Sequence, residues 1–317
     1  MNKKFLISID TEGDNLWNWS IGKEITTENS LYIPPFQSLC EEYQFKPIYL
    51  TNYEMANDTR FVEFAKEKQN LGKCEIGMHL HAWNTPPLDK EHPTRKDCKP
   101  GAPYLIEYSV NLMEDKIKTM THILTEQFGV NPISHRAGRW ATNSLYFDLL
   151  HKYGYKIDCS VTPGINWKNS PGQSPNSKGS NYKNHQNLPY FINNTDLEEY
   201  PVTIFTNHKF IKPDKWNIKS VTKSLVHSLK GNILWLRPTG NNLNECLFVL
   251  NESVHLNNYP YVMFMLHSSE LMPGGSPTFK NSKSIKILYT HLKIIFEQAT
   301  KLGLSGTTFR EIISQNI

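Results

Sequence analysis

Residues 4–14 read Lys-Phe-Leu-Ile-Ser-Ile-Asp-Thr-Glu-Gly-Asp, and this stretch decides how the rest of the chain is interpreted. A short apolar run that stops at polar residues and a glycine is typical of a buried β-strand. Successive side chains of a strand point to opposite faces, so residues two apart lie on the same face. The stretch therefore predicts a first strand over residues 4–9, followed by two carboxylates, Asp10 and Glu12, on one face.

Segments of strand length alternate with segments of helical periodicity along the whole chain. We predict strands at residues 4–9, 46–51, 74–81, 133–136, 156–161, 202–205, 232–237 and 261–267. We predict helices at residues 35–43, 59–69, 111–128, 143–153, 218–229, 242–256 and 283–302. Such alternation indicates a parallel sheet with helices outside it. A barrel of about seven or eight strands suits this chain length.

Two loop segments interrupt this alternation. One is a Pro-rich stretch at residues 84–103, and the other is a tract rich in Asn, Ser, Gly and Lys at residues 163–187. The second tract predicts a mobile surface loop or lid, an insertion that extends to about residue 195. No repeat or linker divides the chain, so residues 1–317 are predicted to form a single α/β domain.

The charge and composition exclude several classes of protein. The chain has 34 basic and 30 acidic residues, a net charge of +4, and its basic residues are scattered, which argues against a nucleic-acid partner. Hydrophobic residues make up 38% of the chain, enough for a folded core. No run approaches the roughly 20 apolar residues of a membrane span. Asp10 interrupts the first apolar run too early for a signal peptide, so we expect a cytoplasmic protein.

The cysteines do not form a recognisable framework. There are five, Cys40, Cys74, Cys98, Cys159 and Cys246, and no two are spaced as in a C-x-x-C motif. An odd number of widely spaced cysteines argues against a disulfide scaffold or a zinc knuckle. We therefore predict ordinary reduced thiols.

Titratable and cationic residues recur where the predicted strands end. They are Asp10 and Glu12, His79 and His81, His135 and Arg136, Asp158, Arg237, and His267. In a parallel barrel the carboxyl ends of the strands meet at one rim, which holds the active site. These side chains are therefore predicted to form one site.

The residue types at this rim favour metal-assisted acid–base chemistry. Two histidines separated by one residue, with a carboxylate nearby, suit a divalent transition metal, for which zinc is the usual choice. Asp10 is the predicted general base, and one or both of the carboxylates Asp10 and Glu12 would join the histidines at the metal. His267 is the predicted general acid, and Arg136 is placed to orient Asp10 by a charge-assisted hydrogen bond.

These phrases, in this order, resemble the five motifs of polysaccharide deacetylases of the NodB-homology type, also called carbohydrate esterase family 4. The matching phrases are residues 7–14, 75–81, 135–140, 158–160 and 265–267, and the resemblance extends over about residues 4–312. The phrases at residues 136–140 and 267–270 look closest to the WalW-like branch, which is associated with gene clusters for cell-surface polysaccharides.

The resemblance implies a distorted (β/α)7 barrel and the removal of an N-acetyl group from an amino sugar. It implies a catalytic set of Asp10, Arg136, Asp158 and His267 and a metal set of Glu12, His79 and His81. His81 is taken from local geometry, because Trp83 occupies the position where the family has its second histidine. The implied substrate is a carbohydrate bearing N-acetyl groups, in contact with Trp83, Trp140, Arg139 and Arg237, and Trp167 is a further candidate stacking face.

Two alternatives to a deacetylase stay open. Some relatives hydrolyse cyclic amides such as allantoin, so a small-molecule amidase is one alternative. A barrel that binds a glycan without hydrolysing it is the other, and the changed histidine spacing favours it. The presence of Asp10, Arg136 and His267 argues against a pure binding module, because such a module needs neither an acid nor a base.

Overall fold

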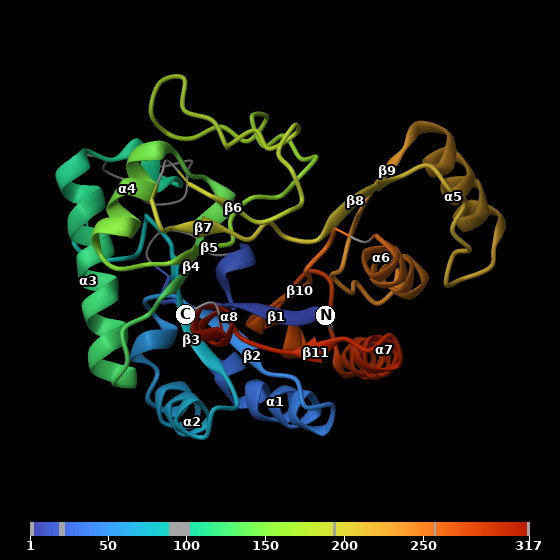
Figure 1. Cartoon of the computed structure of the whole chain (residues 1–317), viewed down its shortest axis with the longest axis horizontal. Coiled ribbons are helices and arrows are strands. Elements are labelled where there is room, and N and C mark those ends of the chain that lie inside the picture. Colours follow the sequence, from blue (N-terminus) through green and yellow to red (C-terminus); the bar gives the residue numbers. More distant parts are fainter. Residues whose placement is uncertain (1–2, 19–22, 89–101, 193–194, 257, 316–317) are drawn as a thin grey trace.

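The computed structural model describes residues 3–18, 23–88, 102–192, 195–256 and 258–315. Its centre is a curved sheet with the strand order β10-β1-β2-β3-β4-β5-β7-β6, and β11 pairs with β1 (Figure 1). All neighbours from β10 to β7 run parallel, and β6 is antiparallel to β7.

The strands of this sheet are β1 (Lys4–Thr11), β2 (Pro47–Thr51), β3 (Glu75–Leu80), β4 (Ser134–Ala137), β5 (Ile157–Asp158), β6 (Tyr190–Phe191), β7 (Glu198–Glu199), β10 (Tyr261–His267) and β11 (Ser305–Gly306). A separate pair consists of β8 (Ile204–Asn207) and β9 (Asn232–Trp235). The helices are α1 (Ile33–Glu42), α2 (Thr59–Asn70), α3 (Val110–Phe128), α4 (Ser144–Lys152), α5 (Ile218–Lys230), α6 (Leu243–His255), α7 (Ser282–Lys301) and α8 (Phe309–Gln315).

Strand β1 shows how the two faces of the sheet are used. Phe5, Ile7 and Ile9 belong to the large apolar core between the sheet and the helices. Leu6 belongs to a second, smaller core on the other face, inside the curve of the sheet. Asp10 lies on this inner face by the two-residue alternation of a strand, so the local pattern of β1 carries its carboxylate to the inner rim.

The predicted distorted (β/α)7 barrel is confirmed, but the sheet is curled into a half-barrel and two predicted strands belong elsewhere. The strand beside β5 is β7, not residues 202–205. The predicted strands at 202–205 and 232–237 appear as β8 and β9, which pair antiparallel with each other. Periodicity marks a segment as a strand but does not select its partner or direction, and the two residues of β7 are too few to show any period. A hydrogen bond of 3.2 Å from Met265 N to Leu236 O connects the end of β9 to β10.

The polar tract at residues 163–187 is a surface loop that is hydrogen-bonded to the barrel. Glu107 Oε2 accepts from the backbone N–H groups of Gln173 and Ser174 at 2.7 and 2.8 Å. Tyr182 donates to the carbonyl oxygen of Trp140 at 2.5 Å. Movement of this loop as a lid stays a prediction.

The structure also bears on the predictions for the cysteines, for the end of helix α3 and for membrane spans. Cys40, Cys74, Cys159 and Cys246 are buried free thiols, as predicted, whereas Cys98 and most of the Pro-rich loop at 84–103 lie outside the described residues. Helix α3 ends at Gly129 in the left-handed conformation (φ 74°), where the sequence predicts its end. Within the described ranges, every helix is too short or too polar to cross a membrane.

Candidate active site

The register of the central strands brings the predicted site residues together. Asp10 on β1 is paired with His267 on β10, and His79 on β3 is paired with Arg136 on β4. Because neighbouring parallel strands end at the same edge, residues from opposite ends of the chain meet there. They adjoin a cavity of about 310 Å³.

Most of the predicted site residues line this cavity. They are Asp10, Glu12, His79, His81, Trp83, Arg139, Trp140, Arg237 and His267, and Trp167 of the surface loop joins them. Arg136 lies directly behind Asp10. Asp158 and His135 do not line the cavity, and their place is described below.

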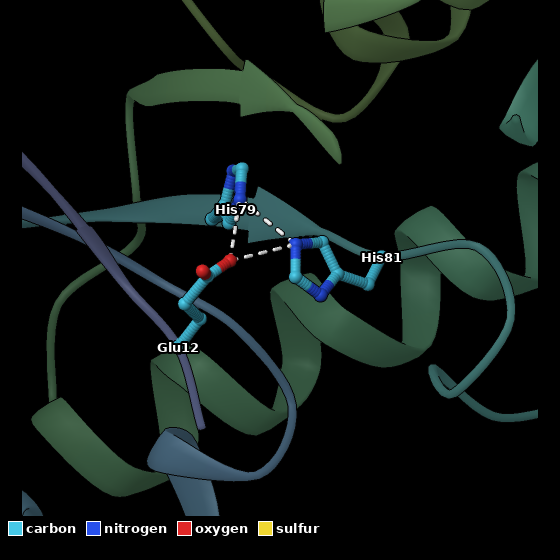
Figure 2. Close-up of side chains that lie close together, drawn as sticks. All are labelled: Glu12, His79 and His81. Atoms are coloured by element: carbon cyan, nitrogen blue, oxygen red, sulfur yellow. Dashed lines mark hydrogen bonds and ion pairs between the residues drawn. The ribbon is translucent and has the colours of Figure 1, made fainter. Parts of the chain in front are cut away.

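Glu12, His79 and His81 form a compact buried cluster (Figure 2). Glu12 Oε2 lies 3.1 Å from His81 Nε2 and 3.6 Å from His79 Nε2. The two Nε2 atoms are 2.9 Å apart. His79 Nδ1 lies 3.0 Å from the carbonyl oxygen of Arg136, which can only accept. The proton of His79 is therefore held at Nδ1, and the Nε2 lone pair is directed toward the cluster.

The chemistry of these donors fits a divalent metal ion. Burial opposes ionisation of Glu12, but His267, His79 and His81 outweigh it and hold the pKa of the carboxyl well below its usual range. Burial and the neighbouring His79 lower the pKa of His81, which favours the neutral imidazole that ligates metals. Burial lowers the pKa of His79, but Asp10 and Glu12 outweigh it and raise that pKa, so a metal ion that binds there displaces a proton. Two imidazole nitrogens and one carboxylate oxygen match a known three-ligand set for catalytic zinc. The cluster could therefore hold a metal ion.

Asp10 is held by the buried guanidinium of Arg136. Arg136 NH1 donates to Asp10 Oδ1 at 2.5 Å, while its other nitrogens donate to Ser8 Oγ and to the carbonyl oxygen of Cys159. Burial opposes ionisation of Asp10, but Arg136, His79 and His267 outweigh it and lower the pKa of this carboxyl. Asp10 Oδ2 is left facing His267 Nε2 at 3.7 Å. Asp10 is thus an ionised carboxylate with one oxygen anchored and the other available.

His267 is oriented by a carboxylate that the sequence prediction did not assign a role. Glu270 Oε2 accepts from the backbone N–H of His267 at 3.0 Å and lies 3.2 Å from its Nδ1. Arg237 donates to Glu270 Oε1 at 3.0 Å. Arg237 also lies 3.2 Å from His267 Nδ1. These contacts hold the ring with Nδ1 toward Glu270 and Arg237 and with Nε2 toward Asp10 and the cavity. The sequence signal that could have revealed this role is the three-residue spacing of His267 and Glu270, which places them one turn apart (Ser268–Leu271).

The Glu270→Gln variant is expected to lose stability in a pH-dependent manner. Burial opposes ionisation of Glu270, but Arg237 and His267 outweigh it and lower its pKa from 4.5 to about 2. A depressed folded-state pKa contributes stability that is present above pH 4.5 and is lost as the pH falls toward 2, about 3 kcal/mol in full. Urea unfolding of both proteins between pH 2 and 7 should show a gap in unfolding free energy that narrows as the pH falls below 4.5. A gap that is constant with pH would contradict this linkage.

The rim next to Arg136 has an unusual backbone. Arg139 and Trp140 both have positive φ angles, 55° and 62°, which are costly for residues other than glycine. Gly138 precedes them, and a Cβ there would lie 2.6 Å from the carbonyl oxygen of Leu80 and 2.8 Å from His81. This glycine lets the rim approach the cluster of Glu12, His79 and His81. Trp140 is held in place above Arg136, whose guanidinium carbon lies 5.2 Å from the centre of a Trp140 ring.

A further aromatic residue of the cavity, Trp17, was not predicted. Its ring packs edge-on against His267 with the ring centres 5.0 Å apart, and its Nε1 donates to Ser269 Oγ at 3.0 Å. Trp17 is 37% exposed, so one of its faces is available to a ligand. No strand-end pattern marks it, because it follows the short turn after Gly13 rather than a strand.

Asp158 lies in a separate buried network beneath the site. Its Oδ1 is 2.6 Å from His135 Nδ1, and its Oδ2 accepts from the backbone N–H of Ser160 at 3.0 Å. His135 Nε2 is in turn 2.8 Å from the hydroxyl of Tyr146. Ser160 Oγ donates to Asp158 Oδ1 at 2.9 Å and accepts from the backbone N–H of Ala137, which lines the cavity. Asp158 is thus connected to the cavity through Ser160, and a catalytic role for it would be one of positioning.

Comparison with known proteins identifies the fold. No family model matches the chain, and no curated protein is significantly similar to it. The chain is similar to a GH57-type branching enzyme from Pyrococcus horikoshii, with 10% identity and a TM-score of 0.52 over 100% of this chain and 71% of that chain. It is also similar to the PuuE allantoinase (12% identity, TM-score 0.51, 98% and 88%) and to a family 4 carbohydrate esterase from Streptomyces lividans (9% identity, TM-score 0.43, 97% and 93%). At these identities the two likenesses with TM-scores above 0.5 show a distorted α/β barrel and nothing finer.

Proposed function

We propose that this protein is a metal-dependent hydrolase that removes an N-acetyl group from an amino sugar. One observation supports this above the others: Asp10 Oδ2 and His267 Nε2 lie 3.7 Å apart, beside the Glu12, His79 and His81 cluster. A base, an acid and a metal cluster around one cavity are the groups that amide hydrolysis requires. The motif resemblance to carbohydrate esterase family 4 supports the same reaction class.

Three groups of residues in the cavity would act as general base, general acid and metal site. Asp10, ionised and anchored by Arg136, accepts the proton of the attacking water through Oδ2. His267, whose ring is oriented by Glu270 and Arg237 at Nδ1, donates a proton from Nε2 to the leaving amine. A divalent ion such as zinc, when bound by Glu12, His79 and His81, supplies polarisation of the carbonyl and a lowered pKa for water.

The cavity favours a small polar substrate unit with an apolar face. Its volume of about 310 Å³ lies at the lower end of the range for small-molecule sites. Trp83 and Trp140 offer ring faces on which a sugar can pack. Arg139 and Arg237 offer donors for its hydroxyl groups or for a charged carrier. We propose an N-acetylated sugar of a surface-polysaccharide precursor, carried on a nucleotide or a lipid, or a short oligosaccharide.

A small-molecule amidase is the second candidate. The narrow cavity and its two arginines would also suit a compact amide rich in carbonyl groups, such as a cyclic ureide. Both candidates use the same base and acid, and the amidase would not always need a metal, so the substrate distinguishes them.

Acetate release is the test of the proposed function. The protein, loaded with zinc or cobalt, is incubated with nucleotide-linked, lipid-linked and oligomeric N-acetyl sugars, and with allantoin in parallel. We expect metal-dependent release of acetate from at least one sugar. Turnover of allantoin without acetate release would select the second candidate. Failure to act on any substrate, by a protein that has bound stoichiometric metal, would overturn both.

A further inference from the structure

An arm formed by β8, α5 and β9 projects from the barrel. In Figure 1 helix α5 lies at the edge of the molecule, beyond β8 and β9 and away from helices α1 to α4. The inner part of the arm is anchored, since Lys209 pairs with Glu252 at 3.1 Å and Phe205 packs against Tyr259. Helix α5 itself has no buried residue.

Helix α5 turns its apolar face outward, the reverse of a helix that packs on a protein core. At about 100° per residue, Ile218, Leu225 and Leu229 lie in one stripe along the helix. Their exposed fractions are 88%, 50% and 83%. The partly covered side of the helix is instead lined by small polar residues, Ser220, Ser224 and Ser228 among them. The apolar stripe is therefore available for a partner outside this chain.

The arm also concentrates positive charge. Residues 208–230 contain six lysines and one acidic residue, Asp214, which gives a net charge of +5 in a chain whose total is +4. Lys219, Lys223 and Lys230 are exposed and lie along one flank of the apolar stripe. Asp214 is turned away from this flank, because its carboxylate accepts from the backbone N–H groups of Leu243 and Asn244 at the start of α6.

An aromatic residue completes the surface. Trp216, immediately before the helix cap Asn217, is 66% exposed. A helix with an apolar face, a lysine-rich flank and a tryptophan at its end has the composition of helices that lie in the interface of a lipid bilayer. Tryptophan rings favour the headgroup level of that interface.

We propose that the arm docks the protein on a membrane surface that contains anionic lipids. The apolar stripe would enter the headgroup region, and the lysines would contact lipid phosphates and carboxylates. A second copy of this chain fits less well, because two arms of net charge +5 repel each other. A nucleic acid would leave the apolar stripe exposed to water. The proposal does not depend on the proposed catalytic activity.

Docking would also bring the cavity near the lipid surface. Trp235 of β9, at the base of the arm, packs against Trp140 of the cavity rim with ring centres 5.8 Å apart. Arg237, two residues beyond Trp235, lines the cavity. The base of the arm is therefore in direct contact with the rim of the cavity.

Vesicle co-sedimentation of the full chain tests the proposal. The probes are vesicles of phosphatidylcholine alone and of phosphatidylcholine mixed with phosphatidylglycerol. We expect binding to the mixed vesicles only, weakened by salt. Replacing Lys219, Lys223 and Lys230 by Gln should reduce the partition coefficient on the order of 100-fold, at ~1 kcal/mol for each lysine. A variant with Ile218, Leu225 and Leu229 changed to Ser should also lose binding.

The matched control uses helix α7, in which Lys283, Lys286 and Lys293 are similarly exposed. Their replacement by Gln removes the same charge and should leave binding within about twofold of the wild type. Emission of Trp216, isolated as the difference from a Trp216→Phe variant, should shift to shorter wavelength on binding.

Three results would overturn the proposal. One is wild-type protein that stays in the supernatant with both kinds of vesicle. Another is a concentration-dependent dimer that the serine variant abolishes, which would assign the stripe to a second copy. The last is arm-dependent binding to polyglutamate without binding to vesicles, which would assign the surface to an acidic protein partner.

Discussion

The Asp10→Asn variant is expected to lose roughly 10²–10⁴-fold in kcat while it still binds metal, which is the range that a positioned general base contributes. Asparagine keeps the shape of the side chain, and its amide oxygen can still accept from Arg136. It cannot accept a proton from water at neutral pH. KM should change little, because Asp10 acts on the water rather than on the sugar.

Stability has to be measured with this variant. Arg136 is fully buried, and weakening its ion pair with Asp10 lowers the free energy of unfolding by up to about 3–5 kcal/mol. Activity is therefore compared well below the melting temperature of the variant. The matched control is Asp58→Asn, which alters a carboxylate paired with Arg60 at 2.9 Å outside the cavity. Full activity in a folded, metal-loaded Asp10→Asn protein would show that another group takes the proton.

The His79→Ala variant is expected to lose both the metal ion and nearly all activity. Polarisation by a bound ion contributes several kcal/mol to the barrier, so its loss reduces the rate by roughly 10³-fold or more. Elemental analysis should find stoichiometric metal in the wild type and little in the variant. A chelator should lower the melting temperature of the wild type, because an ion at 100 times its Kd stabilises the folded state by about 2.7 kcal/mol. The same chelator should not affect the variant.

His122→Ala is the control for the loss of an imidazole. His122 is exposed on helix α3 and is not part of the cluster of Glu12, His79 and His81. Its replacement should leave metal content and activity unchanged. Undiminished metal content in His79→Ala would contradict the assignment of the cluster, whatever the activity of that protein.

The central strands were predictable from the sequence because each is a short apolar segment that ends at polar residues. Strand β1 is a short apolar run that stops at polar residues, which is typical of a buried strand. Residues 198–199 form no such run, so β7 was missed although it occupies a place in the parallel sheet. Residues 202–205 and 232–237 do form such runs, but their antiparallel pairing depends on which edge each strand meets in the folded chain.

The grouping of Glu12, His79 and His81 was predictable from the sequence, whereas the orientation of the neighbouring side chains was not. Glu12, His79 and His81 were selected because each follows or ends a predicted strand. Glu270 was missed as a functional residue because it follows the last strand by three residues in a turn, where no period applies. Trp17 was missed for the same reason.

The sequence by itself determined that Asp10, Glu12, His79 and His81 stand at the ends of strands, since strand alternation is a property of neighbouring residues. The hydrogen bond from Arg136 to Asp10, which the sequence also predicted, is present in the structure. Only the tertiary structure decided that Glu270 orients His267 and that helix α5 exposes its apolar stripe. The contact of Glu270 depends on how the turn after β10 closes, and the exposure of the stripe depends on what covers each face of the helix. These are outcomes of burial and hydrogen bonding summed over the whole fold, and no local pattern encodes them.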